Sequence, residues 1–175
     1  MHKAYNDDEL WRHYLYKTDL RFRADQGFAF SASARLEVVG NSTEYIEFRV
    51  PSGMRVRVYS RIISTEGSNF NVDLCTVSSI TAGATEFNHA NMLIGGSSPL
   101  AKVYAGATNP VGLEVIESSY IPASAQQSTS GALSESMAYR LIDGDTSPQS
   151  VLRIENTENS DRDLSIILLY TEEYL

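Results

Sequence analysis

The chain has 175 residues, a mass of 19.4 kDa and a formal net charge of −8. This length is typical of one domain that buries roughly 70% of the surface of its unfolded chain, so the core needs neither disulfides nor a structural metal. The negative charge argues against nonspecific nucleic-acid binding as the main activity, the longest apolar run is too short to span a bilayer, and the single cysteine excludes an internal disulfide framework.

Residues 5–17, "YNDDELWRHYLYK", have a helical pattern. Asn6 or Asp7 can cap the start of this helix, and its acidic first turn suits the positive end of the helix dipole. An apolar stripe runs along it and consists of Leu10, Trp11, Tyr14 and Leu15. Because a helix of about a dozen residues is marginal on its own, it must dock, either on its own domain or, as an arm, on a neighbouring subunit. We assign residues 1–24 to this N-terminal arm and residues 25–175 to a β-sandwich domain.

From residue 28 onward, apolar and polar residues alternate, which predicts β-strands. The candidate strands are residues 28–38, 44–50, 54–64, 70–77, 111–120, 137–142, 149–156 and 164–170. Turn-rich segments separate them, and the polar segment 123–136 predicts a long exposed loop. About eight strands without an intervening helix predict an all-β fold: an antiparallel β-sandwich, jelly-roll-like, with a short N-terminal helical arm.

The segment "EYIEFRVPSGMRVRVYSRIIS", residues 44–64, alternates on both sides of a Pro51–Gly53 turn, and we predict a β-hairpin there. The apolar face of this hairpin pairs Val50 with Met54, Phe48 with Val56 and Ile46 with Val58. The polar face carries Glu47, Arg49, Arg55, Arg57 and Arg61, and it pairs Glu47 with Arg57, Tyr45 with Tyr59 and Arg49 with Arg55.

The opposed arginines repel each other across the predicted hairpin. One interpretation is a solvated face on which Glu47 and water relieve the repulsion. The other is an interface, at which carboxylates of another subunit or partner bind Arg49, Arg55 and Arg57. Glu172 and Glu173, in the C-terminal tail, are examples of such carboxylates.

The last predicted strand is apolar on both faces. One face carries Leu164, Ile166, Leu168 and Tyr170, and the other carries Ile167 and Leu169. A strand that is apolar on both sides is buried on both sides. Either the N-terminal helix covers the second face, or Ile167 and Leu169 contact a neighbouring protomer in a cyclic oligomer. We favour the neighbouring protomer, because one short helix covers little sheet.

Side chains that carry chemistry are scattered. His2, His13 and His89 have no second histidine at a metal-ligand spacing, and we expect His89 to form local hydrogen bonds in a loop. Cys75 lies in a strand without a basic neighbour that would lower its pKa, so we expect an inert thiol. The "DGDTS" segment from Asp143 lacks the later ligands of a calcium loop and predicts a turn. We therefore expect no enzyme activity, no metal and no cofactor.

Three segments resemble those of tailed-bacteriophage virion proteins: "LWRHYLYKTDLRFRADQG", "STEYIEFRVPSGMRVRVYSRIISTEG" and "VLRIENTENSDRDLSIILLYTEE". They supply an N-terminal segment, a strand that ends in a Pro-x-Gly turn, and a closing strand with an acidic end. In this order the chain is similar above all to head decoration, or cement, proteins with a trimeric jelly-roll body.

This resemblance implies a homotrimer on the outer capsid surface that clamps neighbouring major capsid protein subunits against the pressure of packed DNA. The apolar stripe of the arm would anchor it there, and a polar loop at 121–136 would face solvent. We expect synthesis in the host cytoplasm, because the N-terminal residues lack the apolar segment of a secretory signal. Its place is then the virion, without direct contact with nucleic acid or membrane.

Two other functions fit the same residues. A phage tail fibre, adaptor or receptor-binding protein would use its outer loops and tyrosines to bind a ligand. A carbohydrate-binding β-sandwich module, unconnected to viruses, would be a monomer whose affinity for sugar survives removal of residues 1–20.

Overall fold

The computed structural model describes residues 20–65, 68–121, 130–132, 140–145 and 149–175. Residues 20–25 are helical, and the rest of the described chain forms strands and their connections. The strands are β1 (Ala29–Val38), β2 (Thr43–Arg49), β3 (Met54–Thr65), β4 (Phe70–Val77), β5 (Ser79–Thr81), β6 (Thr85–Glu86), β7 (Asn88–Asn91), β8 (Lys102–Val111), β9 (Glu114–Ile121), β10 (Ser130–Ala132), β11 (Arg140–Asp143), β12 (Gln149–Asn156) and β13 (Arg162–Tyr174).

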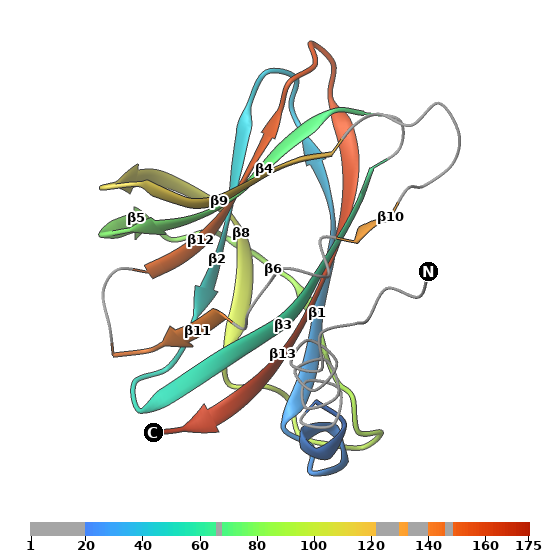
Figure 1. Cartoon of the computed structure of the whole chain (residues 1–175), viewed down its shortest axis with the longest axis vertical. Coiled ribbons are helices and arrows are strands. Elements are labelled where there is room, and N and C mark those ends of the chain that lie inside the picture. The colour runs from blue at the N-terminus through green and yellow to red at the C-terminus, as the bar shows by residue number, and fades with distance from the viewer. Residues whose placement is uncertain (1–19, 66–67, 122–129, 133–139, 146–148) are drawn as a thin grey trace, which may run out of the picture.

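The strands form two antiparallel sheets that pack face to face, which confirms the predicted all-β sandwich (Figure 1). Sheet A has the order β10-β3-β13-β1-β7, with β11 also paired to β3. Sheet B has the order β5-β8-β2-β12-β4-β9, with β6 also paired to β8. The first four strands alternate between the sheets, and the last two then insert, β12 between β2 and β4 and β13 between β1 and β3. This alternation gives the jelly-roll-like arrangement.

The hydrophobic core lies between the sheets. Sheet A contributes Phe30, Val56, Ile166 and Tyr170, and sheet B contributes Ile46, Phe70, Val72 and Ile154, each at most 2% exposed. An aromatic contact joins the two layers, because the ring centroids of Tyr170 in sheet A and Phe48 in sheet B lie 5.7 Å apart. Within sheet A, the Tyr170 ring also lies 5.7 Å from that of Phe30. Each fully buried aliphatic or phenylalanine side chain stabilises the fold by roughly 1.5–3 kcal/mol.

The predicted hairpin at residues 44–64 is wrong, because β2 and β3 lie in different sheets. β2 pairs with β8 and β12, whereas β3 pairs with β13, β10 and β11. The turn at Pro51–Gly53 is a corner between the sheets, at which Gly53 has a φ of 75°. Both strands still direct their apolar face into the core, so the alternation of residues is the same for a corner as for a hairpin. None of the predicted cross-strand pairs forms.

A β-bulge changes the direction of one predicted surface arginine. Leu169 pairs with Ser60 but Tyr170 pairs with Val58, so β3 holds one extra residue at Tyr59. Beyond a bulge the alternation of faces is inverted. Arg61 therefore points into the sandwich, where it is 3% exposed and its Nη2 lies 3.2 Å from Glu117 Oε1. The sequence prediction that Arg61 lies on the polar face is therefore wrong.

Two further expectations need correction. Residues 130–132, inside the predicted polar loop, form β10 and pair with β3, and Ile121 is a buried residue of β9. The ten-residue strand β8 falls where no strand was predicted. The predicted helix at 5–17 lies outside the described residues.

Candidate interaction surface

The arginines of β2 and β3 all have carboxylate partners within the chain. Arg49 Nη2 lies 2.6 Å from Glu47 Oε1 on the same strand. Its guanidinium lies 3.7 Å from the centre of the Tyr104 ring and also donates to the carbonyl oxygen of Gly83. Because Glu47 is buried and also accepts a hydrogen bond from the Gly83 amide at 2.8 Å, this cluster fixes the loop at Gly83 over sheet B.

The first two arginines of β3 pair with later parts of the chain. Arg55 Nη2 lies 3.4 Å from Asp143 Oδ2 in β11, and Arg57 Nη2 lies 3.2 Å from Glu173 Oε1 in β13. Glu173 also accepts from Arg23 at 3.2 Å, so one carboxylate joins the helical segment to both strands. The sequence left open whether water and Glu47 or the carboxylates of a second subunit would neutralise these arginines. In the structure, Arg49, Arg55 and Arg57 each have a carboxylate partner within the chain.

The last strand, β13, has the two apolar faces that its sequence predicts. Leu164, Ile166, Leu168 and Tyr170 are at most 2% exposed and belong to the core. On the outer face, Ile167 is 39% exposed and Leu169 is half-buried. β13 lies at the centre of sheet A, with Ile62 of β3 beside Ile167. We call Ile62, Ile167 and Leu169 the outer strip. Leu10, Trp11, Tyr14 and Leu15, the other predicted interface residues, lie outside the described residues.

A second apolar surface lies at one end of the sandwich, in the loop between β7 and β8. Met92, Leu93 and Leu100 are 41–53% exposed, and Ile94 is 100% exposed. The amide of Gly96 donates to the carbonyl oxygen of Leu93 at 3.0 Å, and Gly95 has a φ of 80°, as the third residue of a type II turn requires. Ile94 is therefore displayed at the corner of a defined turn.

The side chain of Asn91 holds this turn in place. Its Nδ2 donates to the carbonyl oxygens of Gly27 at 2.9 Å and Ser97 at 2.8 Å, and its Oδ1 accepts from the amide of Leu93 at 2.8 Å. A Cβ atom at Gly96 would lie 2.5 Å from Asn91 Nδ2, so a larger residue there would displace the Asn91 side chain from its position. The sequence prediction missed this surface, although the run "MLIGG" combines three apolar residues with a glycine turn.

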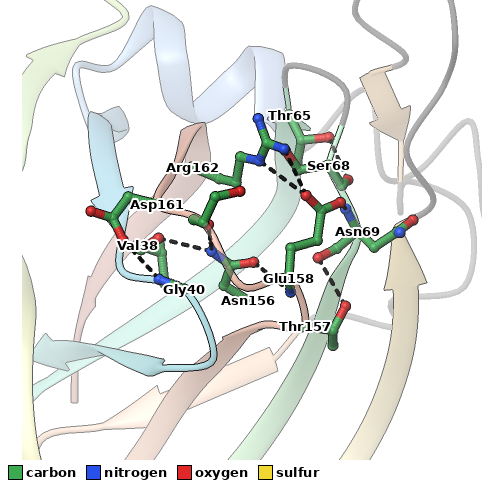
Figure 2. A network of polar contacts seen from close by, with 11 residues as sticks. Val38, Gly40, Thr65, Ser68, Asn69, Asn156, Thr157, Glu158, Asp161 and Arg162 are labelled. Atoms are coloured by element: carbon green, nitrogen blue, oxygen red, sulfur yellow. Dashed lines mark hydrogen bonds and ion pairs between the residues drawn. The ribbon is translucent and has the colours of Figure 1, made fainter.

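A polar network joins three loops at the opposite end of the sandwich (Figure 2). The buried side chain of Asn156 donates to the carbonyl oxygens of Val38 and Ser160, both at 2.9 Å, and accepts from the amide of Glu158 at 3.0 Å. The carboxylate of Glu158 accepts from the Asn69 amide and from Arg162 Nε, both at 3.0 Å. The hydrogen bond from the Asn69 amide lowers the pKa of Glu158 most, and the one from Arg162 lowers it further.

The same network includes the loop between β1 and β2. Asp161 Oδ1 accepts from the amide of Gly40 at 2.9 Å, and the amide of Asn41 donates to the carbonyl oxygen of Glu158 at 2.7 Å. A Cβ at Gly40 would lie 2.4 Å from the carbonyl carbon of Asn159, which shows how closely the two loops approach. Because these polar groups bind one another, we interpret the network as a structural joint between loops.

His89 binds across the edge of the sandwich rather than locally, which corrects the sequence prediction. Its Nε2 accepts from the amide of Val103 at 3.3 Å, so its Nδ1 carries the proton and donates to the Tyr170 hydroxyl at 3.0 Å. That hydroxyl in turn donates to the carbonyl oxygen of Ala101 at 3.3 Å. Burial lowers the pKa of His89, the cation of Lys102 lowers it further, and Glu86 opposes both.

Cys75 is buried in β4, and burial raises the pKa of its thiol. In the described parts of the chain, no group of three or more histidine, cysteine, aspartate or glutamate side chains could hold a metal ion. No helix among the described residues has the length and apolarity that a membrane span requires.

No protein-family model matches the chain, and a search of curated proteins found no match.

Proposed function

We propose that this chain is a virion structural protein of a tailed bacteriophage: a capsid decoration protein that binds the outer capsid surface as a homotrimer and stabilises the shell. The observation that carries the proposal is the rigid apolar turn at Met92, Leu93 and Ile94. A soluble domain that displays a fully exposed isoleucine on a turn held by four hydrogen bonds has an element suited to insertion into another protein.

The energetics of this turn suit adhesion. Covering Ile94 completely would contribute roughly 1.5–3 kcal/mol, and partial cover of Met92, Leu93 and Leu100 would add to it. Because Asn91 already fixes the turn, little conformational entropy is lost when a partner binds. Such contacts, repeated in the three copies of a trimer, give an affinity above that of one copy.

The resemblance to decoration proteins supplies the identity of the partners: other copies of this chain and the major capsid protein. The β-sandwich with alternating strands is compatible with that resemblance, and the body is a shape on which loops at one end can contact a shell. In this proposal the protein is made in the host cytoplasm and resides on the capsid surface.

The test is co-sedimentation of the purified protein with undecorated capsids assembled from the major capsid protein of the same phage, after its oligomeric state has been measured by analytical ultracentrifugation. Ile94→Asp should weaken binding about 10- to 100-fold, because each 1.4 kcal/mol corresponds to a factor of ten. Val39→Asp is the matched control. Val39 is also exposed, at 57%, but it follows the last residue of β1, whereas the turn with Ile94 lies near the first residue of β1.

A trimer that binds shells and loses affinity only with Ile94→Asp supports the proposal. A wild-type protein that stays in the supernatant with shells present overturns it. A protein that ignores shells but binds purified tail parts or host-cell envelopes through the same turn is instead a tail adaptor or receptor-binding protein.

A further inference from the structure

The loop between β7 and β8, residues 92–101, has a neck at which one side chain joins its two ends. His89 lies in β7, just before the loop, and its Nε2 accepts from the amide of Val103 in β8, just after it. The chain passes here from sheet B to sheet A, because β6 pairs with β8 up to Glu86 and the amide of Phe87 still donates to the carbonyl oxygen of Val103 at 2.9 Å. The imidazole therefore takes the place of a backbone acceptor where the β6–β8 ladder ends.

Two side chains of β13 close the same neck from sheet A. The Tyr170 hydroxyl accepts from His89 Nδ1 at 3.0 Å and donates to the carbonyl oxygen of Ala101 at 3.3 Å. The amide of Ala101 in turn donates to Glu172 Oε1 at 2.7 Å. The His89 side chain is 4% exposed, and Tyr170 and Glu172 are buried. We call His89, Tyr170 and Glu172 the clasp. Asn91 anchors the loop up to Ser97, whereas the clasp anchors the residues that follow.

The clasp requires a neutral imidazole. One ring nitrogen of His89 must accept from Val103 while the other donates to Tyr170, and only the neutral tautomer with its proton on Nδ1 does both. A protonated ring donates from both nitrogens, so its Nε2–H would face the N–H of Val103 without an acceptor. Burial lowers the pKa of His89 for the same reason that the clasp holds, because the closed neck excludes the water that would solvate the cation.

The charged groups around the ring lie on its solvent side. Oε1 of Glu86, in β6, lies 4.0 Å from His89 Nε2, and Lys102 of β8 lies 3.1 Å from the same carboxylate oxygen and opposes a second positive charge. The Tyr104 hydroxyl donates to the other oxygen of Glu86 at 3.3 Å. On the other side of β7, the partner of His89 in β1 is the uncharged Ala32. A protonated ring thus finds an acceptor by turning outward to Glu86, which breaks its bonds to Val103 and Tyr170.

We infer that protonation of His89 opens the clasp and frees the half of the β7–β8 loop that follows the Ile94 turn. Opening takes up a proton, so its equilibrium constant rises as the pH falls below 6.5, the ordinary pKa of the ring, by at most about 30-fold at about pH 5. A partner that covers Ile94 then binds more weakly, because it must order a looser loop. This effect on capsid affinity rests on the proposed function, whereas the opening itself does not.

Amide hydrogen exchange at about pH 7.5 and about pH 5 measures the opening, once the intrinsic exchange rate at each pH has been divided out. In the wild type we expect the protection of the Ala101 and Val103 amides to fall severalfold between these two pH values. Amides of β1 and β13, at the centre of sheet A, report global unfolding at each pH. The amide of Asn41, bonded to the carbonyl oxygen of Glu158 at the opposite end of the sandwich, is the control for a change confined to the loop.

Two variants identify the group that takes up the proton. His89→Gln keeps a polar side chain that does not titrate in this range, while His2 and His13 remain, and its loop protection should be the same at both pH values. Glu172→Gln keeps an acceptor for the Ala101 amide and removes the other titratable group of the clasp, a carboxyl whose pKa is raised by burial. This second variant should retain the pH dependence of the wild type.

Three results would overturn the inference: a pH dependence that persists in His89→Gln, one that disappears in Glu172→Gln, or wild-type loop protection that falls only together with that of β13. Co-sedimentation with capsids tests the consequence for binding. The wild type should leave the shells at about pH 5 while His89→Gln stays bound. A protein that never binds shells but opens its loop in acid loses the proposed function and retains this inference, so the two failures are distinguishable.

Discussion

Asn156→Ala tests whether the loop network of Figure 2 stabilises the fold. The Asn156 side chain is 0% exposed and forms three hydrogen bonds, two as donor to the carbonyl oxygens of Val38 and Ser160 and one as acceptor from the Glu158 amide. Each such bond contributes about 0.5–1.5 kcal/mol net, and alanine leaves the buried carbonyl of Val38 without this donor. We expect a loss of about 2–4 kcal/mol in the free energy of unfolding.

Urea unfolding followed by circular dichroism measures this change, and the slope of free energy against urea should stay constant. In a thermal scan the same loss lowers the midpoint by roughly 5–15 °C for a domain of this size. Asn159→Ala is the matched control, because Asn159 is exposed and forms one side-chain bond, from Asn41 Nδ2 at 2.7 Å; it should stay within about 0.5 kcal/mol of wild type. Equal losses for the two variants would refute the reasoning.

Three further predictions concern titratable and charged groups. Because burial lowers the pKa of His89, the native state binds fewer protons than the unfolded chain as the pH falls below the usual value of 6.5, so stability decreases with falling pH in that range. In His89→Gln the free energy of unfolding should depend less on pH, and urea unfolding of both proteins between about pH 8 and about pH 5 measures the difference. The same pH dependence in the variant and the wild type would contradict the expected contribution of His89. Glu173→Gln should lower the free energy of unfolding by less than about 1 kcal/mol, since the ion pairs of Glu173 are partly exposed. Amide hydrogen exchange of residues 20–25 should nevertheless accelerate. Unchanged exchange would show that these ion pairs do not hold the helical segment. Arg61→Met should leave the fold as stable as wild type or more stable, because an apolar side chain of similar length removes the cost of burying a charge. Glu117→Ala should destabilise the fold, because it removes the carboxylate that pairs with Arg61. Denaturation midpoints compare the two variants, and a larger loss for Arg61→Met than for Glu117→Ala would contradict this prediction.

The sandwich could be predicted from the sequence because its long strands alternate clearly. β1, β4, β12 and β13 all fall where the pattern of residues places them. The pairing of strands could not be predicted in the same way. β2 and β3 direct apolar residues to the same core from different sheets, and the pattern of residues does not distinguish this corner from a hairpin.

Local irregularities account for the other differences. The side chain of Arg61 points inward because of the bulge at Tyr59, and no residue type in this part of the sequence marks the position of a bulge. β8 was missed because its buried positions include the small residues Ala105 and Ala107, and because Gly106 and Asn109, both with positive φ, resemble a turn. The candidate site was predicted in part: the two apolar faces of β13 were visible in the sequence, whereas the exposed apolar turn at Met92, Leu93 and Ile94 was missed.

The position of β12 and β13 in the sheets has a consequence for synthesis. Each is inserted between two strands that the ribosome makes much earlier, β12 between β2 and β4 and β13 between β1 and β3. Until both have emerged, four strands with apolar faces lack a partner along one edge, and each sheet lacks one of its central strands. A chain that terminates before residue 149 therefore cannot complete either layer, and nascent chains expose these unpaired strand edges until the final strand has paired.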